Sequence, residues 1–416
     1  MKNTPVICIA LAGSALAMLS TAPAFAQDRA ANEPEAIVVT ARRVEERMQD
    51  VPISMTVFNQ DAITKRDIFN VADLGTYTPS LSTNSRYGPE KASFAIRGFV
   101  QDLDTAPSVG TYFADVPGLR SGAATTGGNG VGVGAMFDLQ NVQILKGPQG
   151  TLFGRNTTGG AVLIVPNRPT DRREGYFEGT LGSYDMRRVQ AVVNVPLAET
   201  FKVRLGVDRL KRDGYLHNHS GIGPDRFANS DYISLRLGVL AEITPDLENH
   251  ALATYARSDN NGVIPRLVGC YGQNGENTAP AGLQGYGAFY GCAQIARQTA
   301  RGDGWWDVEN SEPDPRQLST TWQVINTTTW QASDNLTIKN IVSYGELRET
   351  SRFSLEGENY LNPMIPNATR PDLTIIRIGN TPGHNMASQS TMTEELQFQG
   401  TTMGHKFQWQ AGGYME

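Results

Sequence analysis

The sequence predicts an α+β domain followed by a transmembrane antiparallel β-barrel. Three observations lead to this prediction. The chain opens with a secretory signal, and no later stretch is apolar enough to span a bilayer as a helix. A glycine-dense segment between two β-type runs closes the first 170 residues. From residue 175 onward, strands with one apolar and one polar face recur, and their connections alternate between short and long.

Residues 1–26 form the predicted signal peptide. Lys2 supplies the positive end, residues 6–19 are apolar, and Ala24-Phe25-Ala26 fits the small-residue cleavage motif. The apolar run is too short for a membrane-spanning helix, which needs ~20 residues. We expect cleavage before Gln27. A glutamine rather than a cysteine after the cut argues against a lipid anchor.

The composition fits an exported β-barrel. The net charge of −6 provides no basic footprint for nucleic acid. Hydrophobic residues make up only 39% of the chain and there are 43 glycines. A barrel accommodates such a composition because only alternate residues of each strand face lipid.

Residues 27–50 are predicted to be a flexible tether that carries one β-prone run at residues 35–41. The following stretch, residues 42–50, is charged and has no apolar face. An isolated β-prone run on a tether suits strand addition to the sheet edge of a partner. The alternative is that residues 37–39 are simply the first strand of the next domain. Extended at ~3.3 Å per residue, residues 37–51 would reach roughly 45 Å.

The next domain, residues 51–170, combines strands with short helices. Strands are predicted at 51–58, 93–98 and 108–116, and helices at 61–69 and 70–77, the second capped by Asn70. Residues 121–134 are small and rich in glycine, with a weak GxGxG at 130–134. This stretch lacks the preceding strand and following helix of a dinucleotide site, so we interpret it as a loop.

Residues 138–165 carry the most informative motif of the chain. β-type runs at 142–145 and 161–165 enclose five closely spaced glycines, which allow a tight turn and close backbone approach. A phosphate-binding loop would end in Gly-Lys-Ser/Thr at the start of a helix. Here Lys146 precedes the glycines and a strand follows. A strand–turn–strand packing element is therefore favoured over a nucleotide site.

The run VQILKGPQGTLFGRNTTGGA at residues 142–161 resembles the plug-domain signature of TonB-dependent outer-membrane receptors. The predicted strands at 93–98 and 108–116 also resemble strands of that domain. The family often has Arg-Val-Glu where this chain has Asn141-Val142-Gln143, which places a local salt bridge in question. The resemblance implies that residues 51–170 are a plug and residues 171–416 the N-terminal part of its barrel. It further implies a TonB box whose TonB-contacting residues are Ile37, Val38, Val39, Thr40 and Ala41.

Period-2 alternation identifies the barrel strands. Residues 189–195, 201–207 and 233–239 alternate apolar with polar or glycine positions. A soluble sandwich alternates in the same way, but the connections favour a barrel. From residue 196 on, short and long connections alternate, as periplasmic turns and extracellular loops do. The predicted connections are residues 183–185, 196–200, 212–230, 244–246, 259–318, 332–335, 351–390 and 401–405.

The longest predicted outer loop, residues 259–318, contains the two cysteines that remain after cleavage. In an oxidising compartment Cys270 and Cys292 are expected to form a disulfide, because a zinc site would want more ligands than this region offers. The loop also contains Trp305 and Trp306. Two interpretations of this pair are weighed equally. The tryptophans either contact the ligand, or they belong to loop packing or an interfacial aromatic belt.

About nine barrel strands are predicted, whereas plugged transporters of the resembled family have 22. Nine strands spaced ~4.8 Å apart and tilted ~40° would close at a radius of ~9 Å. A plug of ~120 residues has a radius of gyration near 13–14 Å and would not fit. The chain also stops inside a strand at residues 406–416. We therefore expect an incomplete barrel, either the N-terminal portion of a longer receptor or a truncated gene product.

No motif predicts an enzyme, a cofactor or a metal site. The chain has no G-x-S-x-G elbow and no H-E-x-x-H helix. Glu394 and Glu395 are neighbours in a strand and face opposite ways, so they cannot form an acid/base couple. His217 and His219 lie at i and i+2 in an outer loop. A solvated pair is favoured there, because nothing nearby in the sequence supplies further metal ligands.

The function implied by the resemblance is TonB-dependent active uptake of a scarce nutrient, such as a ferric siderophore or similar iron complex, across the cell outer membrane. The implied partners are TonB with its inner-membrane energising complex, outer-membrane lipid and the small-molecule ligand. The alternative is a surface β-rich binding or structural protein without energised transport.

Overall fold

The computed structural model describes most of the chain after residue 36. None of the helices that it describes has the length and hydropathy needed to pass through a lipid bilayer. Several segments lie outside the described residues. They include the predicted signal peptide, residues 27–36, residues 121–129 of the predicted glycine-rich loop, and His405. The described ranges are 37–85, 88–101, 105–119, 130–270, 287–371, 377–380, 384–404 and 406–416.

The N-terminal domain is built on a five-stranded sheet in the order β3-β8-β9-β6-β7. Strands β6 and β9 pair in parallel, and the other neighbours pair antiparallel. A separate hairpin joins β4 to β5. The strands are β3 (Met55–Asn59), β4 (Leu81–Asn84), β5 (Ser93–Ile96), β6 (Val109–Phe113), β7 (Val116–Pro117), β8 (Leu139–Lys146) and β9 (Gly160–Pro166).

Short helices connect these strands, and local backbone geometry sets their ends. The predicted helix at 61–69 is shorter, α1 (Gln60–Lys65), because Asp67 takes a left-handed φ of 51°. The predicted helix at 70–77 starts at a capping box on Asn70 and runs through η2 (Val71–Asp73) into α2 (Leu74–Tyr77). The remaining short helices are η1 (Met48–Asp50), η3 (Pro89–Lys91) and α3 (Gly150–Phe153).

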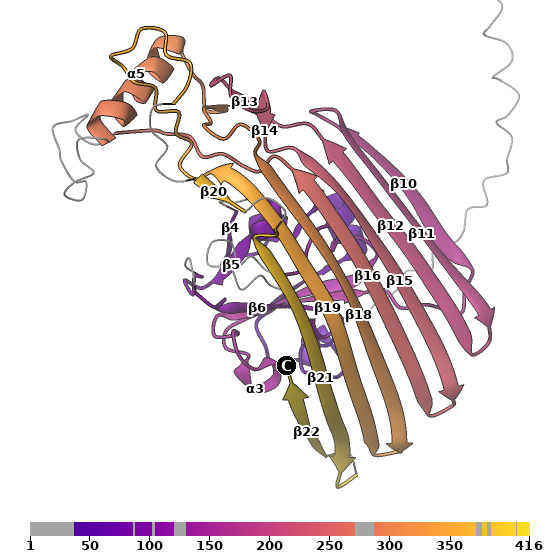
Figure 1. The fold of residues 1–416 in the computed structure, drawn as a ribbon. Coiled ribbons are helices and arrows are strands. Elements are labelled where there is room, and N and C mark those ends of the chain that lie inside the picture. Colours follow the sequence, from indigo (N-terminus) through magenta and orange to yellow (C-terminus); the bar gives the residue numbers. More distant parts are fainter. Residues whose placement is uncertain are drawn as a thin grey trace, which may run out of the picture.

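The second half of the chain forms one long antiparallel sheet, in which each strand pairs with the next long strand along the chain. Figure 1 shows these strands side by side in a single curved sheet, with the N-terminal domain against one face. The nine strands predicted from the sequence are confirmed. They are β10 (Glu174–Gly182), β11 (Met186–Ala198), β12 (Phe201–Arg212), β15 (Ser230–Thr244), β16 (Leu247–Asn260), β18 (Arg316–Ser333), β19 (Leu336–Ser354), β21 (Ala387–Thr402) and β22 (Phe407–Met415).

The two faces of this sheet have the polarity of a membrane barrel. On β12, Lys202, Arg204 and Asp208 are buried, and Arg204 binds Asp138 of the N-terminal domain, whereas the alternating Leu205 is 49% exposed. Phe177 on β10 is 76% exposed. A soluble sandwich would bury its apolar face and expose its polar face. This sheet does the opposite, as strands facing lipid on one side and a polar lumen on the other must.

The long connections gather at one end of the sheet and fold against one another (Figure 1). They were predicted as plain loops, but they contain secondary structure because their apolar side chains share a core that includes Leu216, Phe227, Ile264, Val308 and Phe353. Short strands from two of these loops form a three-stranded sheet. The loop elements are β13 (Leu216–Asn218), β14 (Arg226–Phe227), the π-helix η4 (Gly287–Gly291), α5 (Cys292–Arg301), β17 (Asp307–Val308) and β20 (Arg377–Gly379).

Candidate functional site

The first described residues are folded onto the N-terminal domain, in place of the extended tether expected from the sequence. Strand β1 (Val38–Val39) pairs antiparallel with β2 (Glu46–Arg47). Val39 and Ala41 are 1% and 0% exposed and pack with residues of β8 and β9. Apolar burial of this kind explains why the segment from residue 37 to 50 is ordered.

Two buried amides of β8 hold this N-terminal segment by hydrogen bonds. Asn141 Nδ2 donates to the Val38 carbonyl at 3.0 Å. The Thr40 N–H donates to Gln143 Oε1 at 3.1 Å, and Gln143 Nε2 donates to Thr40 Oγ1 at 3.2 Å. Gln143 Nε2 also donates to Asn141 Oδ1 at 2.9 Å, which orients the two amides together. At about 0.5–1.5 kcal/mol per hydrogen bond, the three bonds to the segment contribute only a few kcal/mol.

The sequence singled out Asn141 and Gln143 only as departures from the family pattern. Their contact with the N-terminal segment was missed, because it spans 103 residues of sequence. Asn141 and Gln143 are two neutral amides on either side of Val142, and such a pattern carries no sequence signal that would have identified the contact.

Arg43, two residues beyond Ala41, joins the N-terminal domain to the long sheet. Its guanidinium donates to the carbonyls of Asp115 at 3.1 Å and Leu152 at 3.3 Å. The guanidinium also lies 3.6 Å from the Glu395 carboxylate on β21. The backbone carbonyl of Arg43 accepts a hydrogen bond from Gln399 Nε2 at 3.1 Å. Arg43 is therefore bonded to the domain and to the sheet at once.

Lys339 of β19 adds a second ionic contact at the same place. Its ammonium lies 2.8 Å from Asp115 Oδ2, and Arg43 lies 3.6 Å from the other oxygen. Burial alone would raise the pKa of Asp115, but the positive charges of Lys339 and Arg43 outweigh it and hold that pKa below its usual value. Asp115 thus stays ionised and bridges both cations.

Asp138 is the centre of the main contact between the domain and the sheet. Arg204 of β12 binds both of its carboxylate oxygens, donating from Nε at 2.8 Å and from Nη2 at 2.5 Å. Arg236 of β15 donates to the carbonyls of Phe137 at 2.8 Å and Asp138 at 3.1 Å. Asn167 Nδ2 donates to Asp138 Oδ1 at 2.9 Å. Arg236 Nε is buried without a hydrogen-bond partner, but the bidentate Arg204–Asp138 pair is of the kind that can stay buried.

A further polar contact lies near the ends of the strands that carry the long loops. Ser258 Oγ donates to the half-buried Glu90 at 2.5 Å, and Asn260 Nδ2 donates to it at 3.3 Å. Beside it, Lys91 bridges to Glu349 of β19 at 3.1 Å. Burial raises the pKa of Glu90 to about 7. The domain is therefore attached to the sheet by polar contacts at both ends.

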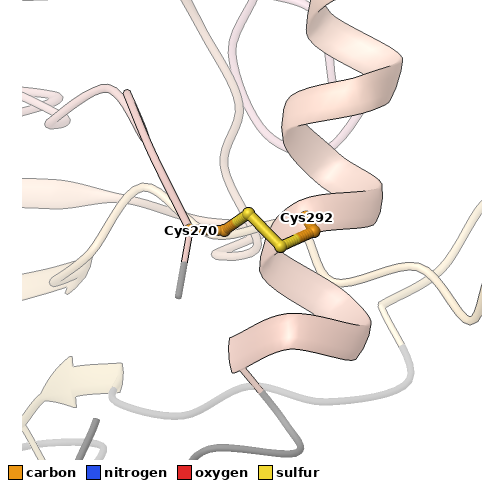
Figure 2. Close-up of a disulfide and its surroundings, with 2 residues drawn as sticks. All are labelled: Cys270 and Cys292. Carbon is orange, nitrogen blue, oxygen red and sulfur yellow. A yellow bond between two sulfur atoms is a disulfide. The ribbon is translucent and has the colours of Figure 1, made fainter. Parts of the chain in front are cut away.

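The disulfide joins the longest loop to its helix. Cys270 is bonded to Cys292, the first residue of α5, with Cα atoms 5.2 Å apart (Figure 2). In the same loop Trp305 is 72% exposed and Trp306 is 55% exposed. The Trp306 ring lies edge-on to Tyr215, 5.5 Å between centroids. Trp306 is thus partly packed against the neighbouring loop, while Trp305 is open to solvent.

Glu394 and Glu395 serve different partners. Asn340 Nδ2 donates to Glu394 at 3.2 Å, whereas Glu395 lies near Arg43.

The N-terminal segment, residues 37–41, is held by hydrogen bonds that a competing strand could replace. This arrangement can bind and release a peptide segment; it positions no nucleophile beside a base.

Replacing Gln143 with leucine should loosen the N-terminal segment without unfolding the domain. The change removes the two hydrogen bonds to Thr40 and leaves an apolar side chain of similar size in a buried place. We expect residues 37–41 to exchange their amide hydrogens at least about tenfold faster, in line with a loss of about 1.4 kcal/mol or more. Hydrogen-exchange mass spectrometry checks this. Gln149→Leu, which alters an amide bonded only to its own loop, is the matched control; equal exchange in the two variants would contradict the role of Gln143.

Comparison with known proteins shows which family the N-terminal domain matches. Residues 47–161 match the family described as TonB-dependent Receptor Plug Domain. The pesticin receptor of Yersinia pestis is 27% identical over 201 residues, which cover 48% of this chain and 28% of that protein. The ferripyoverdine receptor of Pseudomonas aeruginosa is 27% identical over 168 residues, covering 40% of this chain and 19% of that protein. The chain therefore matches less than a third of the length of these relatives.

Solved structures extend the likeness to the long sheet. The ferric yersiniabactin uptake receptor FyuA from Yersinia pestis matches with a TM-score of 0.57 and 15% identity, over 87% of this chain and 60% of that one. The ferric-catecholate import receptor Fiu from E. coli K12 matches with a TM-score of 0.61 and 16% identity, over 88% of this chain and 50% of that one. The fold is thus a plug domain with part of its barrel. The relatives are receptors, which confirms the prediction that the chain is not an enzyme.

Proposed function

Because this chain belongs to the TonB-dependent receptors of the outer membrane, we propose that it takes part in active uptake of a scarce nutrient, energised by TonB. The observation that carries the proposal is the place of residues 37–41. They are held on the plug by replaceable hydrogen bonds, and Arg43 ties them to the barrel wall.

The position of this segment supports a periplasmic role. Gln399, which bonds to the Arg43 carbonyl, lies three residues before the end of β21 at Thr402. β22 begins at Phe407, so the connection after β21 is short, and the long loops lie at the opposite end of the sheet (Figure 1). In transmembrane barrels short turns are periplasmic and long loops extracellular. The segment then faces the periplasm, where TonB can reach it.

In the proposed mechanism, TonB pairs with Ile37, Val38, Val39, Thr40 and Ala41 by adding a strand. Release of this TonB box breaks its bonds to Asn141 and Gln143, at a few kcal/mol, and also exposes the buried Val39 and Ala41. Strand pairing with TonB and the pull that follows offset this cost. A pull on the released box next reaches Arg43. Breaking its contacts with Asp115 and Glu395 weakens the attachment of the plug to the barrel wall, and the plug can then shift.

For the nutrient we propose a ferric siderophore or a similar iron complex. Support comes from the similar proteins, which include the ferripyoverdine receptor and the ferric yersiniabactin uptake receptor. A vitamin B12 transporter of Vibrio vulnificus, 26% identical over 168 residues, makes cobalamin the second ligand class to test. The folded outer loops, with the exposed Trp305, supply the surface that would meet the ligand first.

Deleting residues 37–41 should abolish energised uptake while ligand binding at the cell surface is retained. The physical reason is that the described parts of the outer loops lie at the end of the sheet opposite to this segment (Figure 1). The measurement compares binding and uptake of labelled ferric siderophores and cobalamin by iron-limited cells that express the full gene.

Two point variants make that test sharper. Val39→Pro removes an amide that strand addition needs, and Val39→Ile, which keeps both the amide and the β-branched shape, is the matched control. Uptake should fail in the first and persist in the second. A passive surface protein without energised transport would show no difference between them, and that outcome would refute the proposal.

A further inference from the structure

The two outer-loop histidines lie beside carboxylates that the sequence places far away. His219 Nε2 is 2.8 Å from Asp307 Oδ1, although 88 residues separate the two. One ligand atom each from His219, Asp303 and Asp307 lie within 4.8 Å of one another. The sequence favoured a solvated histidine pair because no further ligands stood nearby; the folded loops bring two.

Strand pairing creates this juxtaposition. β13 and β17 pair in parallel, with His217 opposite Asp307 and Asn218 opposite Val308. The pairing is extended by backbone hydrogen bonds from His217 to Trp306 at 2.8 Å and from His219 to Val308 at 2.9 Å. Since side chains two residues apart in a strand share a face, His217 and His219 flank Asp307 from the same side.

Both carboxylates are oriented by other donors. Arg301 binds Asp303 through two bonds of 2.6 Å, and the Gly304 N–H donates to Asp307 Oδ2 at 2.6 Å. A carboxylate has about four lone-pair positions, so each oxygen can still bind a cation. Partners that orient ligands in this way are typical of metal sites.

The charged groups around the cluster are balanced, and two of the three ligands reach solvent. Asp303, Asp307 and Glu309 are the carboxylates, Arg297 and Arg301 pair with them, and Arg266 donates to the Asp303 carbonyl at 3.3 Å. The ligand side chains of His219 and Asp307 are 37% and 24% exposed, so an ion from solvent can reach them.

We propose that His219, Asp303 and Asp307 form an outer-loop site for a divalent transition-metal ion, with Zn²⁺ as the ion that best suits the ligand set. Imidazole and carboxylate ligands bind Zn²⁺ at ~2.0–2.2 Å, which puts two ligand atoms of a tetrahedral site about 3.4 Å apart. Small side-chain rotations from the observed spacing reach that geometry. The fourth position is left for water or for His217. The ion would join the loop of β13 to the loop of β17.

This site is independent of the proposed uptake function, because it involves neither the TonB box nor the plug. Zn²⁺ titrated calorimetrically into the purified full chain in detergent, with its disulfide intact, should bind at one equivalent. His219→Gln should weaken that binding about 100-fold or more, since losing even a supporting partner of a ligand costs about 10–100-fold. Asp307→Asn should do the same.

His384→Gln is the matched control, because His384 is an exposed loop histidine whose contact with Asn380 uses only its backbone carbonyl. It should bind Zn²⁺ like the wild type. Absorption bands of Co²⁺ in the visible region report four-coordinate geometry and should vanish in His219→Gln. No one-equivalent binding in the wild type, or equal binding in His219→Gln and His384→Gln, would overturn the site. His219 is exposed, so its replacement leaves the loop fold intact, which the thermal transition of each variant checks.

Discussion

Replacing Gly160 with alanine should prevent the plug from forming its native sheet. Gly160 has a φ of 154°, and a Cβ added to it would lie 2.2 Å from the Leu145 carbonyl oxygen and 2.8 Å from Ile96 Cδ1. The carbonyl belongs to the backbone of β8, which pairs with β9 through Leu145–Ala161 and Lys146–Gly160. Neither strand can shift without breaking this ladder. Backbone strain of about 1–3 kcal/mol and overpacking of about 1–3 kcal/mol together predict a loss of about 2–6 kcal/mol.

The measurement is hydrogen exchange of peptides from β8 and β9, since the tryptophans of this chain all lie beyond the plug. Gly150→Ala is the matched control, because no atom lies within 4 Å of the Cβ it would add. It should leave the opening free energy of these peptides, as hydrogen exchange reports it, within about 0.5 kcal/mol of the wild type, as surface changes usually do. Wild-type protection in Gly160→Ala would show that the β8–β9 turn tolerates a side chain there.

Replacing Asp138 with asparagine should detach the plug from the barrel wall. The carboxylate neutralises Arg204 and lies beside Arg236, both of them buried. Without it Arg204 keeps only the more exposed Glu174 carboxylate, 3.3 Å away, and Arg236 loses the carboxylate beside it. Removing one partner of a buried pair costs about 3–5 kcal/mol. Asparagine accepts the left-handed φ of 52° at this position, so the loss reports charge rather than backbone strain.

Asp185→Asn is the matched control for this charge change. Asp185 has a similar φ of 51° and also pairs with an arginine, Arg187, but both side chains are more than half exposed. Exposed pairs contribute about 0–1 kcal/mol, so this variant should behave like the wild type. The urea concentration at which plug peptides lose protection measures both. A shift of the same size in the two variants would contradict the role assigned to Asp138.

Local pattern predicted the elements whose causes are local. The alternation in β12 and β15 follows from the period of two in a strand, and the capping box at Asn70 follows from residues three apart. The glycine-dense turn was expected from its composition, and Gly160 does take a conformation that side chains avoid. The alternation of short and long connections predicted which end of the sheet carries the folded loops.

Contacts across long stretches of sequence could not be read in this way. The docking of residues 37–41 on Asn141 and Gln143 depends on two segments about 100 residues apart, and neither has a pattern that names the other. The same holds for His219 with Asp303 and Asp307, which meet only because β13 pairs with β17. Asp138 likewise meets Arg204 and Arg236 only where the plug lies against the wall.

By itself the sequence determined that this protein has a plug-like domain and a sheet whose apolar face suits contact with lipid and whose other face is polar. Those properties depend on spacing along the chain, which burial and strand geometry convert directly into structure. Only the tertiary structure decided how residues 37–41 are held and which loop residues meet. Such contacts depend on the three-dimensional packing of distant segments, which leaves no periodic trace in the order of residues.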